Sequence, residues 1–217
     1  MNLTEITEAA NNSGLDVLGV FHVRDDDPVP EGSKSMVMLG PNGREFWDVF
    51  SASAEYLDGQ ADPVDRWSLR VIGGLADNLG GSALFPFGGP PWLPFISWAQ
   101  RAGAWSSPVG LLVHHRYGLF VSYRGALALP YEIDIPAEPV RPCDTCGKPC
   151  LTACPVSALT EDGYDTEACH AWLDQPEGHD CMSRGCAVRR ACPVGQYRRQ
   201  DAQSAFHMAA FHGTEGT

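Results

Sequence analysis

The residues of this chain best suited to chemistry are its cysteines. All eight fall within residues 143–192 of a chain of 217, and the part before them has none. Four thiolates are what a cubane [4Fe–4S] cluster requires, so eight cysteines suit two such clusters. In chain order they are Cys143, Cys146, Cys150, Cys154, Cys169, Cys181, Cys186 and Cys192.

The spacing of these cysteines is close to that of bacterial ferredoxins. The ferredoxin run is C-x2-C-x2-C-x3-C-P, and its fourth cysteine binds the other cluster of the pair. Here the first run, CDTCGKPCLTACP, has gaps of two, three and three residues, so one gap is a residue longer. The Cys-Pro ending is present at Pro155 and occurs again at Pro193. The pattern favours two iron–sulfur clusters in this stretch.

Three other uses of cysteine stay open at this point. Disulfide bonds form in oxidising compartments, but the first residues, MNLTEITEAANNSG, lack the basic and apolar regions of a secretory signal. Two zinc sites of four cysteines each are the second alternative, although zinc ligands usually come as two separated pairs. Inert buried thiols are the third, and the crowding of the cysteines argues against them. We expect a cytoplasmic protein with reduced thiols.

The net charge of −12 is distributed unevenly. Residues 1–138 carry 17 acidic and 8 basic side chains, which disfavours nucleic acid as a partner. No apolar run is long enough to suggest a membrane span. Residues 139–200 are nearly neutral, and their basic side chains either offset the negative charge of a thiolate-bound cluster or are simply solvated. The basic residues in question are Arg141, Lys148, Arg184, Arg189 and Arg190.

Hydrophobic periodicity and turn residues predict a mixed α and β chain. We expect strands at 15–23, 35–39, 109–114, 119–123 and 126–129, the third and fourth forming a hairpin. We expect helices at 3–13, from Asn42 onward, at 63–79, up to about 102, and at 204–212. Asn42 and Glu45 have the spacing of a capping box. Three prolines within 136–142 indicate a linker between two domains.

The order of these elements, the segment AGAWSSPVGLLVHHRYGLFVSYRGALAL at 102–129 and the downstream cysteines together resemble the epoxyqueuosine reductases. They resemble the respiratory reductive dehalogenases more distantly. The resemblance covers most of residues 1–200. It implies an α+β protein with a nitroreductase-like, cobalamin-binding α/β domain at 1–138. A ferredoxin-like domain with two [4Fe–4S] clusters follows at 139–200, and 201–217 form a tail.

Carried over position by position, the resemblance assigns the cysteines to two sets that mix both halves of the stretch. One cluster is expected on Cys143, Cys146, Cys150 and Cys192, and the other on Cys154, Cys169, Cys181 and Cys186. Each half then contributes to both clusters. Metal ligation would supply much of the folding free energy of so small a domain.

Two departures from the family pattern bear on activity. The position of the family's catalytic Asp falls on Gly89, in a segment without any carboxylate. The general acid of that reaction is therefore missing. The family's C-terminal repeat domain, which helps to bind tRNA, has no counterpart in the chain. We expect no epoxyqueuosine reduction, and we assign no residue a catalytic or cobalamin-binding role.

The leading hypothesis is an iron–sulfur protein that relays single electrons from a redox partner protein. The electrons would pass through both clusters to a corrinoid or similar cofactor in the N-terminal domain. One alternative is a non-catalytic ferredoxin-type carrier or adaptor whose N-terminal domain docks a partner. Another is a zinc-stapled interaction module.

Overall fold

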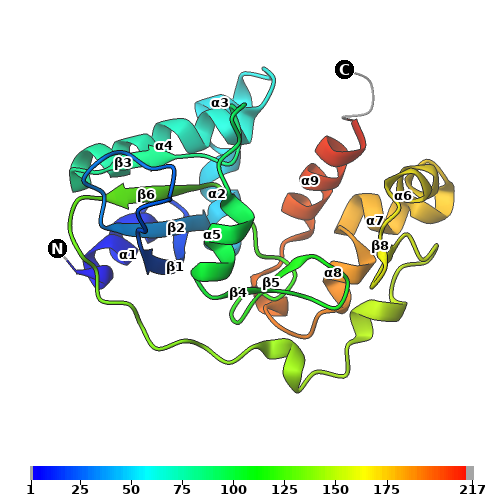
Figure 1. Ribbon diagram of the computed structural model, residues 1–217. Coiled ribbons are helices and arrows are strands. Elements are labelled where there is room, and N and C mark those ends of the chain that lie inside the picture. The colour runs from blue at the N-terminus through cyan, green and yellow to red at the C-terminus, as the bar shows by residue number, and fades with distance from the viewer. Residues whose placement is uncertain (1, 214–217) are drawn as a thin grey trace. The chain divides into compact units, whose positions relative to one another are not determined.

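The computed structural model describes residues 2–213 and has a mixed α+β architecture with small antiparallel sheets (Figure 1). The chain divides into two compact units. The first unit contains the residues up to Ala104 together with Ser122–Pro139. The second contains Trp105–Val121 and the described residues from Val140 onward. The mixed α+β class predicted from the sequence is confirmed at this level.

A four-stranded antiparallel sheet forms the centre of the first unit. Its strands, in spatial order, are β1 (Leu15–His22), β2 (Ser35–Pro41), β6 (Gly125–Leu129) and β3 (Ser82–Leu84). The three strands predicted within residues 15–39 and 126–129 are confirmed. Because β6 lies between β2 and β3, the chain returns to the middle of the unit after its excursion into the second unit.

Helices cover both faces of this sheet (Figure 1). Alternate side chains of β2 and β6 pack with Trp98 of α5 (Phe95–Arg101) in one buried cluster. On the other face Ile72 of α4 (Pro63–Leu79) approaches the backbone at Gly125. Every residue of β6 is buried. Burial on both faces explains why these strands are continuously apolar rather than alternating.

The remaining helices of the first unit are α1 (Leu3–Asn11), α2 (Arg44–Ser51) and α3 (Ala54–Leu57). The helix predicted after Asn42 is present as α2, but the predicted capping box is wrong, because Gly43 is the N-cap and no side chain caps the helix. α4 begins with Pro63 and ends at Gly80 in the left-handed conformation, as its end residues predict. Within the described residues, no helix combines the length and apolarity that a membrane crossing requires.

The hairpin predicted for 109–114 and 119–123 is not formed. β5 (Leu112–His114) pairs with β4 (Ala104–Ser106), and residues 119–123 belong to no strand. Two backbone hydrogen bonds between His114 and Gly118, of 2.8 and 3.1 Å, close a tight turn directly after β5. Leu119 then enters a buried cluster of the second unit instead of pairing along β5.

Short helices and turns make up the rest of the second unit. They are η1 (Pro142–Asp144), η2 (Pro149–Thr152), β7 (Leu159–Thr160), β8 (Gly163–Tyr164), α6 (Thr166–Leu173), η3 (Pro176–Gly178), α7 (His179–Arg184), α8 (Ala187–Ala191), η4 (Gln196–Arg198) and α9 (Asp201–Gly213). α9 packs on α7 and buries Met208, so it is part of this unit and not a separate tail. The last part of the predicted tail, 214–217, lies outside the described residues.

The two units differ from the contiguous domains predicted at 1–138 and 139–200. The segment 105–121, predicted in the first domain, packs with the cysteine-bearing loops. Its apolar side chains Val109, Val113 and Leu119 share one buried cluster with Cys150 and Cys192. Burial of these side chains in the second unit is the physical reason for the difference.

Candidate metal centres

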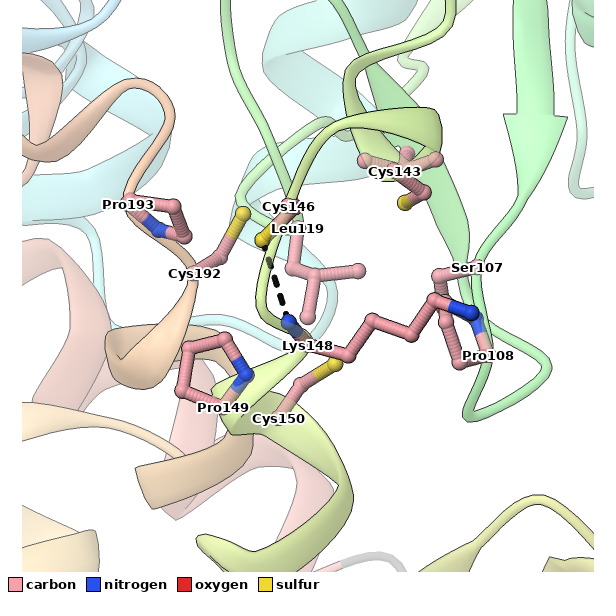
Figure 2. A pocket seen from close by; sticks show the side chains of 11 residues that line it. Ser107, Pro108, Leu119, Cys143, Cys146, Lys148, Pro149, Cys150, Cys192 and Pro193 are labelled. Atoms are coloured by element: carbon pink, nitrogen blue, oxygen red, sulfur yellow. Dashed lines mark hydrogen bonds between the residues drawn. The ribbon is translucent and has the colours of Figure 1, made fainter.

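Four cysteines line a single pocket in the second unit. They are Cys143, Cys146, Cys150 and Cys192, called site 1 below, and Figure 2 shows their side chains around a common space. This space is partly open to solvent. The four residues are the set that the resemblance assigned to one cluster. The pocket therefore brings together three cysteines of the first run and one from far along the chain.

Short local structures position these sulfurs. Cys143 lies in η1 and Cys150 in η2, each of which begins with a proline that presets the first turn. Cys192 is the C-cap of α8, whose Val188 is fully buried against the same cluster as Cys150. Packing of α8 on η2 thus carries Cys192 to the first run.

The site 1 thiols influence one another electrostatically. Burial raises the pKa of the Cys143 thiol; Arg141 lowers it, and the sulfurs of Cys150, Cys192 and Cys146 raise it again. Burial likewise raises the pKa of Cys150, with further increases from Cys192 and Cys146. Four thiolates so placed repel each other, and a bound cation or cluster would remove that repulsion.

The other four cysteines form a second group, site 2. Burial raises the pKa of Cys169, a hydrogen bond from Tyr164 lowers it, and Cys186, Cys154 and Cys181 raise it. Cys169, Cys181 and Cys186 pack in one hydrophobic cluster, and the Cys154 sulfur acts on that of Cys169. The resemblance assigned these four cysteines to one cluster.

Site 2 draws its sulfurs from four stretches of chain. Cys154 follows η2, Cys169 lies in α6, Cys181 in α7, and Cys186 is the N-cap of α8. The side chain of Asp165 caps α6 by accepting a hydrogen bond of 2.9 Å from the backbone N–H of Ala168. That cap fixes the start of the helix that carries Cys169.

Backbone N–H groups point at one sulfur of each site. The N–H of Lys148 donates to Cys146 Sγ at 3.3 Å (Figure 2), and that of Ala158 donates to Cys154 Sγ at 3.2 Å. Hydrogen bonds to cysteine sulfur stabilise the thiolate form and are one of the means by which proteins set the potential of an iron–sulfur cluster.

Tyr164 and Arg189 lie at site 2, and Tyr164 was not singled out from the sequence. The Tyr164 hydroxyl donates to Cys169 Sγ at 3.3 Å, and burial together with this bond raises the pKa of Tyr164. Burial lowers the pKa of Arg189, while the Cys186 sulfur acts in the opposite direction. A guanidinium remains charged at neutral pH. Arg189 thus places a positive charge beside the site 2 sulfurs.

The other basic residues singled out from the sequence have different roles. Arg184 and Arg190 both form ion pairs with Asp180. Arg141 donates to the backbone carbonyl of Ser106 at 2.7 Å, and Lys148 lines the site 1 pocket. The contacts that each side chain makes in the folded chain distinguish these roles, because all five residues are simply basic in the sequence.

A histidine pair near site 2 was also missed. His170 Nδ1 lies 3.1 Å from His212 Nδ1, and His212 Nε2 lies 2.9 Å from Asp174 Oδ1. His170 therefore contacts α9, and this contact depends on how α9 packs.

A site for one metal ion is the alternative to a cluster of four irons. Within residues 2–213, no group of three His, Cys, Asp or Glu side chains converges closely enough to hold one metal ion. Structural zinc draws four ligand atoms to about 2.3 Å from one ion. In a [4Fe–4S] cube each thiolate binds a different iron, so the four sulfurs surround a larger body. Four thiols around one pocket, as in site 1, are the donor set that such a cube requires.

Known proteins give no further guide to the identity of these sites. No protein-family model matches the chain, and no curated protein matches it significantly. The resemblance to the epoxyqueuosine reductases therefore stays a prediction.

The segment 105–121 passes close to Cys192 at Gly118. A Cβ atom there would lie 2.4 Å from the Val194 carbonyl oxygen and 2.8 Å from Cys192 Sγ, and the backbone is left-handed with φ +54°. Only a residue without a side chain permits this approach.

Gly118→Ala should therefore destabilise the second unit more than Gly110→Ala. Both glycines have positive φ, so each alanine costs about 1–2 kcal/mol in backbone strain. A Cβ at Gly110 meets open space, whereas Gly118→Ala adds a clash worth roughly another 1–3 kcal/mol. Denaturant unfolding and hydrogen exchange of 105–121 measure the difference. Equal losses in the two variants would contradict the packing described here.

Proposed function

We propose that this protein is an iron–sulfur electron carrier with one [4Fe–4S] cluster at site 1 and one at site 2. The observation that carries the proposal is the pocket that gathers three cysteines of the first run with Cys192 from far along the chain. Cys169, Cys181 and Cys186 pack together in a second cluster. A [4Fe–4S] cluster accepts and releases one electron at a time at a potential set by its surroundings.

The residues of the chain hold the clusters and set their surroundings. The Lys148 and Ala158 N–H groups, the Tyr164 hydroxyl and the Arg189 guanidinium would each stabilise negative charge on the sulfur they face. Apolar side chains around Cys150 and Cys192 limit the access of water to site 1. Both effects act on cluster potential.

The first unit is the proposed recipient of the electrons. The resemblance assigns it a nitroreductase-like fold with a corrinoid or similar cofactor, and a sheet covered by helices on both faces is compatible with that assignment. A second candidate role for this unit is docking a partner protein. Trp92 and Ile96, which are 66% and 67% exposed, favour this second role, because large exposed apolar side chains often mark contact surfaces.

Anaerobically purified protein should contain about eight irons and eight acid-labile sulfides per chain, as two cubane clusters require. Chemical analysis with EPR of the dithionite-reduced protein measures this. Fewer than about four irons, or stoichiometric zinc instead, would defeat the proposal. Titration with cobalamin, followed by calorimetry and absorbance, tests the corrinoid role separately, and absence of binding would leave the docking role.

Cys192→Ser should remove or alter the site 1 cluster and leave site 2 intact, although Cys192 lies closer in sequence to Cys186. Cys181→Ser is the matched variant and should affect site 2 alone. EPR of the reduced proteins distinguishes the two signals. Loss of the same signal in both variants would show that Cys192 and Cys181 bind the same cluster.

Arg189→Gln should lower the midpoint potential of the site 2 cluster, because a positive charge beside the sulfurs favours the more negative reduced state. Arg184→Gln is the control, since Arg184 is exposed and pairs with Asp180. Redox titration measures both variants. Equal shifts in the two would mean that the effect is one of overall charge.

A further inference from the structure

Ser107 lies in the wall of site 1 and has an unpaired hydroxyl. The residue is 6% exposed and lines the pocket formed by the four site 1 cysteines (Figure 2). Its Oγ is buried and has no hydrogen-bond partner among the described residues. The residue comes from the 105–121 segment, which contributes no cysteine.

The backbone of Ser107 is by contrast fully bonded. Its N–H donates to the Leu111 carbonyl at 2.8 Å, and its carbonyl accepts from the Gly110 N–H at 3.0 Å. These two bonds close a turn that holds the side chain at the pocket. Serine hydroxyls in loops often hydrogen-bond to nearby backbone groups, but the Ser107 hydroxyl does not.

Few groups in the pocket can accept a hydrogen bond from the Ser107 hydroxyl. The walls that the 105–121 segment and the prolines provide are apolar: Pro108, Val113, Leu119, Pro149 and Pro193. Buried hydroxyls are almost always hydrogen-bonded, because burying one without a partner costs free energy. The sulfurs of site 1 are the acceptors gathered in this pocket.

We infer that Ser107 donates an O–H···S hydrogen bond to a sulfur atom of the cluster at site 1 and raises the potential of that cluster. The inference rests on the proposed function. A hydrogen bond to sulfur stabilises the reduced cluster more than the oxidised one, because the reduced cluster carries one more negative charge. Ser107 is thus a tuning residue supplied by a segment outside the cysteine stretch.

Redox titration of the full chain, with both clusters present and followed by EPR, tests this inference. Ser107→Ala should lower the reduction equilibrium constant of the site 1 cluster by about tenfold, which is about 59 mV for a one-electron couple. The site 2 potential should not change. Ser107→Thr keeps the hydroxyl and should stay close to wild type, as should Ser106→Ala, which changes an exposed neighbouring side chain. The signal lost in Cys192→Ser identifies site 1.

An unchanged site 1 potential in Ser107→Ala, or equal shifts at both sites, would overturn the inference. If Ser107→Ala does not retain its site 1 cluster, the site 1 potentials of Ser107→Thr and Ser107→Val are compared instead. These two side chains are similar in size, and only threonine has a hydroxyl. Equal site 1 potentials in that pair would then overturn it. Failure of the proposed function is a separate result, because it appears as missing iron and sulfide in the wild-type protein before any potential is measured.

Discussion

The convergence of sulfurs from distant segments is the constraint on which the second unit depends. Thiolates resist being buried together, and for this reason burial and neighbouring sulfurs both raise the pKa of Cys143, Cys150 and Cys169. The helices that carry the cysteines are short and give little stability by themselves. A bound group that takes up the sulfur charge would turn a set of mutually repelling thiolates into the main source of cohesion in this unit.

The 105–121 segment gives site 1 a wall that the cysteine loops lack. Gly118 lets the chain pass against Cys192 and Val194, and Tyr117 accepts a hydrogen bond of 2.9 Å from Arg198. The segment leaves the first unit after Ala104 and returns to it at Ser122, so both of its ends are anchored there. The covalent chain therefore passes between the two units at three points, after Ala104, Val121 and Pro139, rather than through a single linker.

The two sites are surrounded by different chemistry. Site 1 has the Lys148 N–H, the Ser107 hydroxyl and apolar walls, whereas site 2 has Arg189, the Tyr164 hydroxyl and the Ala158 N–H. A fixed positive charge and a neutral donor stabilise negative charge to different degrees. Two proposed clusters of the same type would then differ in potential, which gives single-electron transfer a preferred direction.

Sequence alone determined the features that depend on local residue pattern. The apolar runs of β1 and β2, the Pro63 start and Gly80 end of α4, and the cysteine spacing could all be predicted from neighbouring residues, because period, capping and ligand spacing act over a few positions. The two cysteine sets came from a resemblance, and the structure gathers the four residues of one set around a single pocket. The apolar run at 119–123 had the composition of a strand, yet burial against Cys150 prevailed over local propensity.

Tertiary structure decided everything that rests on long-range packing. The membership of 105–121 in the second unit and the pairing of His170 with His212 both join residues without any shared sequence period. The same is true of the Ser107 hydroxyl, one serine among many until folding buries it in the wall of site 1. A sequence records which groups are present, but only the folded chain decides which of them are removed from water together, and that sets their charge, potential and partners.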